Sequence, residues 1–325
     1  MRDKVKYTPD LDYLNKRELG LLKNACSSIK NFVFKSNKIN KTDYKTRDAH
    51  VTPYSSLRGT FLSYDNFEEK DFFPSKEIDC IIRISNAHVK RVTLNRTLPA
   101  YGFSIKLSSN GSTVLNLPLV NFPLFPINSI SVFLKIFTSV NHLFSGNYFQ
   151  KFWSFFSILK NLIVVIPDFF HPSMISEVFK LVRKRKIFIL SFDYHSIGAY
   201  RLGDHLVKYK LVPIQVPEKK YIDKRLDLAI ADHLNDHHYD LELMIQYCYN
   251  LSDQPINQLN KMWKNSDFIP IGKIKISELI DKDDIAIEQM SFNPFESIMG
   301  LQPVGKIQKL RDEAYKISFK TRNNE

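Results

Sequence analysis

The spacing of apolar and polar residues divides the chain into stretches of predicted strand and helix. From about residue 57 to 128, short apolar segments separated by Asn, Gly, Ser and Pro are typical of antiparallel strands. Within them, Ser108-Ser-Asn-Gly111-Ser predicts a hairpin turn, because Asn-Gly readily adopts the left-handed backbone of a tight turn. Residues 186–276 return to the same pattern, with a helix predicted at 255–264. We therefore expect the β-structure in these two stretches.

Helix is predicted in the remaining parts of the chain. Residues 1–45 are polar and mixed, and we expect them to form an N-terminal helical arm ahead of one main domain, residues 46–325. The imperfect apolar stripe of this arm comprises Leu14, Leu19, Leu22 and Ile29. Residues 129–185 are also predicted to be mainly helical.

Residues 130–166 are the most apolar stretch and are rich in phenylalanine. Lys135, His142, Lys151 and Lys160 interrupt it, so it lacks the roughly 18 uncharged apolar residues of a transmembrane span, and none is predicted. Two interpretations stay open. These residues pack as ordinary core, or some of them form an exposed amphipathic face that meets membrane lipid or a partner as a peripheral contact.

Composition narrows the class of protein. The chain has 325 residues, 44% of them hydrophobic, which is enough for one large domain with appended helices. The net charge is +12, but Lys and Arg are spread along the chain rather than interleaved with aromatics, so no nucleic-acid partner is expected. Three cysteines show no metal-ligand spacing, and the N-terminus has no apolar leader. A cytoplasmic protein with reduced thiols is predicted.

The C-terminal segment from Arg311 through Tyr315 to Arg322 carries the first candidate chemistry. On a helix, offsets of 0, 4 and 11 residues at about 100° per residue place the three side chains within roughly 40° of one another. Two fixed cations beside a phenol favour its ionised form, and tyrosinate is an iron ligand. The alternative is an amphipathic terminal helix whose Tyr packs and whose Arg residues are solvated.

A second segment changes the balance between these two interpretations. Near the N-terminus the chain reads Arg47-Asp-Ala-His50, followed by an Arg-Gly-x-Phe sequence that ends at Phe61. With the Arg-x-x-x-Tyr-x6-Arg spacing at the C-terminus, this segment resembles the haem catalase superfamily, most of all the short catalase-like haem proteins. The resemblance implies that His50 is the distal histidine, a neutral imidazole that moves a proton between the peroxide oxygens.

The same resemblance implies the haem ligands. Tyr315 would be the axial iron ligand, and Arg311 would support its phenolate. Arg47 and Arg322 would pair with the haem propionates. The implied cofactor is haem b.

Three segments in the middle of the chain occur in the order that the resemblance requires. They are Ile82-Arg83-Ile84-Ser85-Asn86, Ala100-Tyr-Gly-Phe-Ser-Ile-Lys-Leu107 and Asn121-Phe-Pro-Leu-Phe-Pro126. By resemblance, Ser85 would hydrogen-bond the distal histidine, and Asn121 would orient peroxide through an amide that does not titrate. The other interpretation of Asn121 is an Asx turn before proline.

The chain also departs from the pattern of typical catalases. Tyr101 replaces an Arg that helps to hold a propionate there. Ala49 stands where catalases usually have Val, immediately before the distal histidine, and the smaller side chain predicts a wider space above the iron.

A fold and a function follow from the resemblance. It implies an α+β protein: a catalase-like antiparallel β-barrel with surrounding helices and a C-terminal proximal haem helix, so that residues 46–325 would be the catalase-like haem-binding domain. The expected function is haem-dependent decomposition of hydrogen peroxide or an organic hydroperoxide. The alternative is a non-catalytic or membrane-associated haem-binding protein of the same fold. A homodimer through the N-terminal arm is also implied.

One rival site has no connection with haem. His233 and His237 are four residues apart, a spacing that can hold zinc on a helix. No Glu follows His233 as in His-Glu-x-x-His, and no distant ligand is identifiable. We expect a polar loop or helix at this place.

Overall fold

The computed structural model describes residues 2–91, 99–184, 187–215, 225–282 and 284–324. The strands are β1 (Pro53–Ser63), β2 (Glu77–Asn86), β3 (Tyr101–Ser109), β4 (Ser112–Val120), β5 (Tyr194–His195), β6 (Ala199–Leu202), β7 (His205–Pro213), β8 (Asp240–Tyr247), β9 (Phe268–Ile280) and β10 (Pro303–Val304). The α-helices are α1 (Lys16–Asn40), α2 (Ile130–Ser145), α3 (Tyr148–Phe169), α4 (Pro172–Arg183), α5 (Leu226–Asp236), α6 (Ile285–Gln289) and α7 (Lys306–Arg322).

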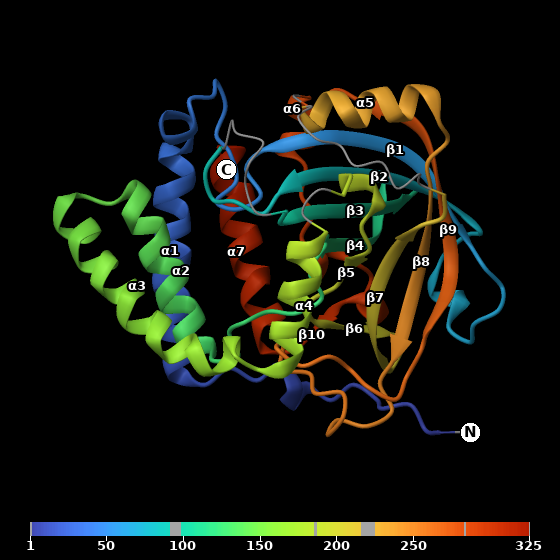
Figure 1. Cartoon of the computed structure of the whole chain (residues 1–325), viewed down its shortest axis with the longest axis horizontal. Helices are drawn as coiled ribbons and strands as arrows, with labels where there is room; N and C mark the ends of the chain where they lie inside the picture. The colour runs from blue at the N-terminus through green and yellow to red at the C-terminus, as the bar shows by residue number, and fades with distance from the viewer. Residues whose placement is uncertain (1, 92–98, 185–186, 216–224, 283, 325) are drawn as a thin grey trace.

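Eight of the strands close into an antiparallel barrel. Their order is β1, β2, β3, β4, β5, β7, β8 and β9, and β9 pairs back with β1. Strands β6 and β10 extend the sheet from β7. The predicted α+β fold with an antiparallel barrel is therefore confirmed, and Figure 1 shows the helices gathered mostly at one side of it.

Alternation of side chains along the strands fills the barrel. In β2, Ile78, Cys80, Ile82 and Ile84 are fully buried inside it, as the two-residue period of a strand requires. The hairpin between β3 and β4 is confirmed. Its turn residues Asn110 and Gly111 have φ angles of 51° and 77°, a left-handed backbone that this pair tolerates well.

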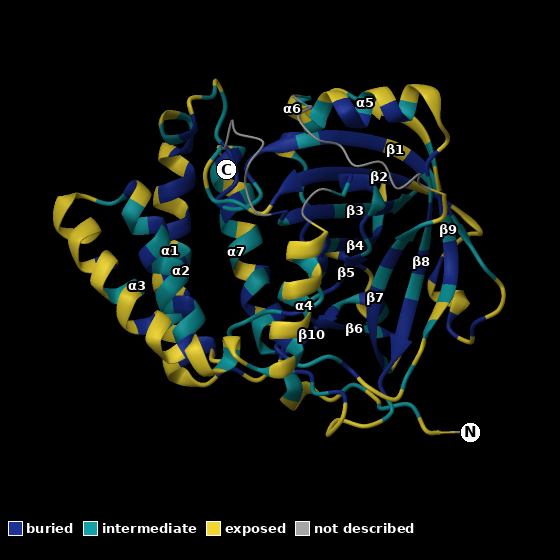
Figure 2. Cartoon of the chain, in the orientation of Figure 1, coloured by how far each residue is buried: buried dark blue, intermediate teal, exposed yellow. Residues whose placement is uncertain are grey.

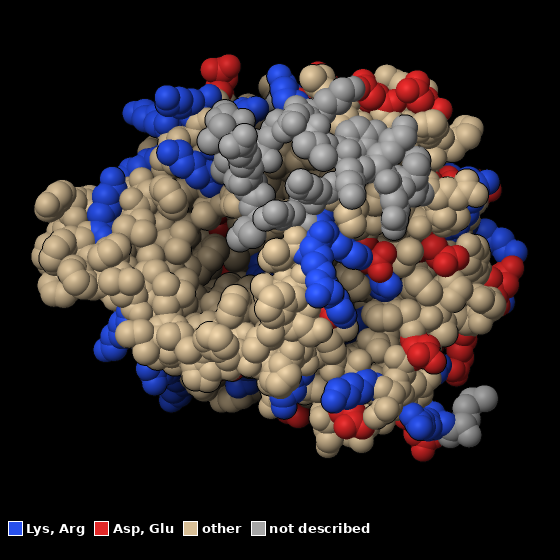
Figure 3. All heavy atoms as spheres, viewed as in Figure 1, with Lys and Arg blue, Asp and Glu red and all other residues tan. Residues whose placement is uncertain are grey.

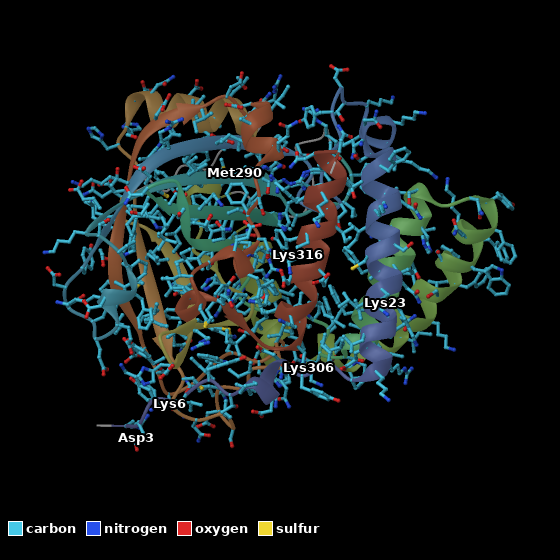
Figure 4. The ribbon with its side chains drawn as sticks, turned by 180° about the vertical axis from the view of Figure 1, so that it is seen from behind. Asp3, Lys6, Lys23, Met290, Lys306 and Lys316 are labelled. Atoms are coloured by element: carbon cyan, nitrogen blue, oxygen red, sulfur yellow. The ribbon has the colours of Figure 1, made fainter. Side chains whose placement is uncertain are left out.

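The helices form a layer against the outer face of the barrel. Figures 1 and 4 show α7 between the barrel and α1, and Figure 4 marks it by Lys316. Helix α1 packs on α7 and α2, and α2 packs on α3. The predicted N-terminal helix is present only over Lys16–Asn40, because residues 2–15 form a short 3-10 helix and extended chain. Leu22 and Ile29 of the helix and Leu14 ahead of it are buried, whereas Leu19 is exposed.

The structure contradicts one helix prediction and agrees with another. The helix predicted at 255–264 is wrong, because this segment is an irregular loop held by contacts of its polar side chains. Trp263 Nε1 donates to the carbonyl of Pro255 at 3.0 Å, and Asn257 Nδ2 donates to that of Leu11 at 3.1 Å. The three helices α2, α3 and α4 agree with the prediction for residues 129–185.

Candidate functional site

A cavity of about 300 Å³ lies between the outer face of the barrel and helices α1, α2 and α7. Arg83, Ser104 and Pro118 form its floor, and they stand side by side because they are paired in register across β2, β3 and β4. Its apolar walls come from the helices and include Leu22, Ile29, Phe133, Leu134, Phe137 and Leu310. Among the polar residues at the cavity, four are arginines, Arg47, Arg83, Arg311 and Arg322, and one is an aspartate, Asp48.

Helix α7 presents Arg311, Tyr315 and Arg322 to the cavity along one face, as the spacing predicts. Arg311 Nη2 donates to the Tyr315 hydroxyl at 3.2 Å, and Nη1 donates to Gln308 Oε1 at 2.8 Å. The guanidinium is thereby held beside the phenol. Its positive charge would stabilise a phenolate at this position.

Two buried arginines keep part of their hydrogen-bonding capacity free. Arg47 Nη2 donates to the carbonyls of Ile287, Glu288 and Met290 at 3.0–3.2 Å, and Arg322 Nη1 donates to Ser318 Oγ at 3.2 Å. The Nε of each has no partner in the part of the chain that the structure describes. Burial lowers the pKa of Arg322 to about 10, so the residue still carries its charge at neutral pH. Such donors suit an anionic ligand.

His50 lies at the cavity in a backbone conformation that few residues adopt. Its φ angle is 56°, in the left-handed region. Nδ1 lies 3.3 Å from Ser85 Oγ, which agrees with the contact implied for Ser85. A Cβ at Gly102 would stand 2.3 Å from this ring nitrogen, so the neighbouring strand must carry glycine here for the imidazole to fit.

The surroundings keep the His50 imidazole neutral. Burial lowers its pKa to about 4, and the positive charges of Arg83 and Arg311 act in the same direction. A neutral imidazole at the cavity wall can accept a proton near neutral pH.

A buried ion pair next to His50 was not predicted from the sequence. Arg83 of β2 meets Glu288 of α6, with Nε–Oε1 at 2.5 Å and Nη2–Oε2 at 3.1 Å, and both side chains are almost fully buried. Burial opposes ionisation of Glu288, but Arg83 and Arg47 outweigh it and hold the pKa of this carboxyl below its usual value. Arg83 Nη1 also donates to the carbonyl of His50 at 3.0 Å. A lone arginine within the apolar run Ile81-Ile-Arg-Ile84 could have indicated such a pair.

The structure does not bring Asn121 to the cavity wall. Its Oδ1 accepts from the Tyr101 amide at 2.8 Å, and its Nδ2 donates to the Pro99 carbonyl at 2.7 Å. Both ends of the amide therefore serve the backbone of a distant segment, so the role of Asn121 is structural, but it is not the Asx turn of the alternative interpretation. Tyr101, in the place of the expected Arg, packs edge-on against Tyr54 and Phe192 and supplies no charge.

The rival histidines gain no support as a metal site. His233 is buried at the end of α5 and packs against Phe188 and Tyr239. His237 is exposed. Among the described residues, no group of three or more His, Cys, Asp and Glu is arranged to hold a metal ion.

The fold is that of the catalases. A fungal catalase superposes with a TM-score of 0.66 at 17% sequence identity, over 89% of this chain and 61% of that one. Catalase A from Saccharomyces cerevisiae superposes with a TM-score of 0.64 at 17% sequence identity, over 89% of this chain and 63% of that one. A bacterial catalase superposes with a TM-score of 0.61 at 15% sequence identity, over 89% of this chain and 59% of that one. The chain thus spans about three fifths of the length of each of these catalases. No protein-family model and no curated protein matches the sequence.

The residues at the cavity fit a haem group. Tyr315 offers a phenol supported by a guanidinium, and the walls are largely apolar. Arg47 and Arg322 each hold a buried Nε that lacks a partner in the described part of the chain, as expected for groups that receive carboxylates. A dianionic ligand would also offset the positive charge that these arginines bring together.

Proposed function

We propose that this chain is a haem-dependent oxidoreductase that decomposes peroxides, with Tyr315 as the iron ligand. The observation that carries the proposal is the convergence of Tyr315, Arg311, His50, Arg47 and Arg322 on one cavity of a catalase-like fold. These five residues come from segments more than 200 positions apart in the sequence.

Each residue has a separate task in the proposed mechanism. Tyr315 would hold the iron through its phenolate oxygen, and Arg311 would stabilise that negative charge. Arg47 and Arg322 would pair with the two propionates through their free Nε groups. When bound, the haem iron supplies the redox centre for cleavage of the O–O bond.

His50 would move the proton. Its neutral imidazole accepts a proton from one peroxide oxygen and returns it to the other, which leaves as water or an alcohol. Ser85 and the Arg83 contact to the His50 carbonyl hold the residue in place. Ala49 also lines the cavity, and its small side chain leaves room for an organic hydroperoxide as well as for hydrogen peroxide.

Peroxide consumption by the haem-loaded protein tests this proposal. His50→Ala should keep its haem, because Tyr315 anchors it, but should lose about 10²–10⁴-fold in rate, the usual contribution of a general acid–base group. The exposed His238→Ala, at which no change is expected, is the matched control. Equal rates for His50→Ala and the wild type would remove His50 from the mechanism. A haem-bound wild type without turnover would favour the non-catalytic haem-binding alternative.

A further inference from the structure

Helix α3 exposes most of its apolar residues, and two of the three residues that it buries are polar, which is unlike a helix packed on a soluble core. The residues that it buries are Ser154, Asn161 and Val165. Its contact with α2 includes a hydrogen bond between Ser139 Oγ and Ser157 Oγ at 2.9 Å. Twelve of its large apolar and aromatic side chains are exposed, among them Phe149 (68%) and Ile163 (67%).

Exposed apolar side chains continue along the chain into helix α4. Phe179 and Val182 of α4 are 63% and 42% exposed. We call these two side chains, together with the twelve exposed apolar and aromatic side chains of α3, the α3–α4 apolar face. Figure 2 shows α3 as mostly exposed at one end of the molecule, and Figure 3 shows the region as a broad area with few charged side chains. Apolar surfaces of this extent mark interaction sites.

The segment that carries the α3–α4 apolar face is basic. Residues 130–184 contain six Lys and Arg but only two Asp and Glu, a net charge of +4. The two acids have partners: Asp168 accepts from Asn128 at 2.9 Å, and Glu177 pairs with Lys180 at 2.6 Å. Successive residues of a helix are about 100° apart, so Lys151 and Lys160 lie on the two flanks of the side of α3 that faces away from α2. Long basic side chains so placed can reach lipid headgroups while the stripe contacts acyl chains.

We propose that the α3–α4 apolar face docks on the surface of an anionic lipid bilayer, with α3 lying in the plane of the interface. An anionic surface complements the basic residues, whereas a second copy of the chain would bring two like-charged sets together. Helix α3, with 22 residues and a mean hydropathy of 1.4 over its most apolar 18 residues, is the one helix in the described part of the chain long and apolar enough to span a membrane. A span would expose Ser154, Ser157 and Asn161 to lipid, whereas a helix in the interface keeps them against α2.

Vesicle flotation with the full-length chain tests docking directly. The probes are vesicles of phosphatidylcholine alone and of phosphatidylcholine with phosphatidylglycerol. The protein should float with the anionic vesicles, and added salt should weaken the association. The assay needs no haem, so its failure is independent of the proposed peroxide chemistry.

Tryptophan fluorescence gives a second readout at the surface itself. The chain has two tryptophans: Trp153 of α3 is 56% exposed, and Trp263 is buried. Anionic vesicles should shift the emission of the wild type to the blue, and Trp153→Phe should abolish this shift while Trp263 stays unaffected.

Matched variants decide whether the α3–α4 apolar face is responsible. Phe152→Ser with Phe156→Ser should lower the vesicle-bound fraction by about tenfold or more, because two exposed rings that would contact lipid are lost. The control is Ile285→Ser with Met299→Ser, two exposed apolar residues at α6 and at Met299–Leu301, and it should bind like the wild type. Circular dichroism checks that each variant folds.

A charge variant keeps the test valid if the serine variant fails to fold. Lys151→Glu with Lys160→Glu should reduce binding to the anionic vesicles. Failure of the wild type to float, or undiminished flotation of a folded serine or charge variant, would overturn the proposal. A wild type that forms dimers and ignores vesicles would assign the surface to a second copy instead.

Discussion

At the scale of single residues, the proposed chemistry depends on how His50 is held. Its left-handed backbone, the Ser85 hydroxyl and the absence of a side chain at Gly102 together place the imidazole at the cavity. The residue thus occupies an uncommon conformation that its neighbours enforce, a feature concentrated at functional sites.

The pH dependence of peroxide consumption reports on this environment. Because the pKa of His50 is lowered to about 4, its imidazole is neutral above that pH and becomes charged only as the pH falls through it. A neutral base is required, so the His50-dependent rate should stay level from about pH 8 to about pH 5 and decline below. A decline centred near the ordinary histidine value of about 6.5 would contradict the lowered pKa.

Gly102→Ala tests the close approach of β3 to His50. The new methyl group would collide with the imidazole, so we expect the ring to leave Ser85 and the peroxide rate to fall about tenfold or more, while haem stays bound. Gly20→Ala in α1, where a Cβ meets nothing within 4 Å, is the control. Unchanged rates in both variants would show that the position of His50 does not depend on Gly102.

Sequence reasoning found some of these residues and missed others for physical reasons. Arg311 and Tyr315 were predictable because helical spacing alone puts them on one face. Asn121 was not, since the sequence cannot tell whether an amide before proline serves the backbone or a cavity. Glu288 was missed because its partner Arg83 lies 205 positions away.

At the scale of elements, the Arg83–Glu288 pair joins β2 of the barrel to α6. Helix α6 in turn offers its C-terminal carbonyls to Arg47, so the pair and these hydrogen bonds fix the loop that carries His50. Loss of one partner from a buried ion pair leaves an uncompensated charge.

Glu288→Gln should therefore destabilise the protein strongly. We expect its free energy of unfolding to fall by about 3–5 kcal/mol, the usual cost of breaking a buried pair. Glu278→Gln is the matched control, because Glu278 pairs with Arg58 at 3.2 Å on the exposed surface of β9 and β1. That change should cost less than about 1 kcal/mol. If urea unfolding showed the same loss of unfolding free energy for both variants, the buried pair would stabilise the protein no more than the exposed pair does.

The elements themselves were largely predictable where local pattern decides them. The helices α2, α3 and α4 follow from their composition, and the β3–β4 hairpin follows from Asn110-Gly111. The loop at 255–264 was mispredicted because its structure depends on distant partners. Leu259, for example, donates its amide to Asn128 Oδ1 at 2.8 Å, a contact across 131 positions.

At the scale of the whole molecule, the barrel and the helical layer create the cavity between them. The closure of the barrel by the pairing of β7, β8 and β9 could not be read from any local pattern, and it was expected only from the family resemblance. The exposed side of α3 was one of two open interpretations of the apolar stretch, because composition does not reveal which face of a helix is buried. The division into arm and domain and the homodimer stay predictions.

The absorption spectrum of the protein expressed with haem supplied is the sharpest test of Tyr315 as the iron ligand. The wild type should show a high-spin ferric spectrum of a phenolate-ligated haem, because Tyr315 offers its oxygen beside Arg311. Tyr315→Phe keeps the volume of the side chain but removes the ligand atom, so haem should be lost or bound with a changed spectrum. A colourless wild type, or a Tyr315→Phe variant with unaltered haem content and spectrum, would contradict the account.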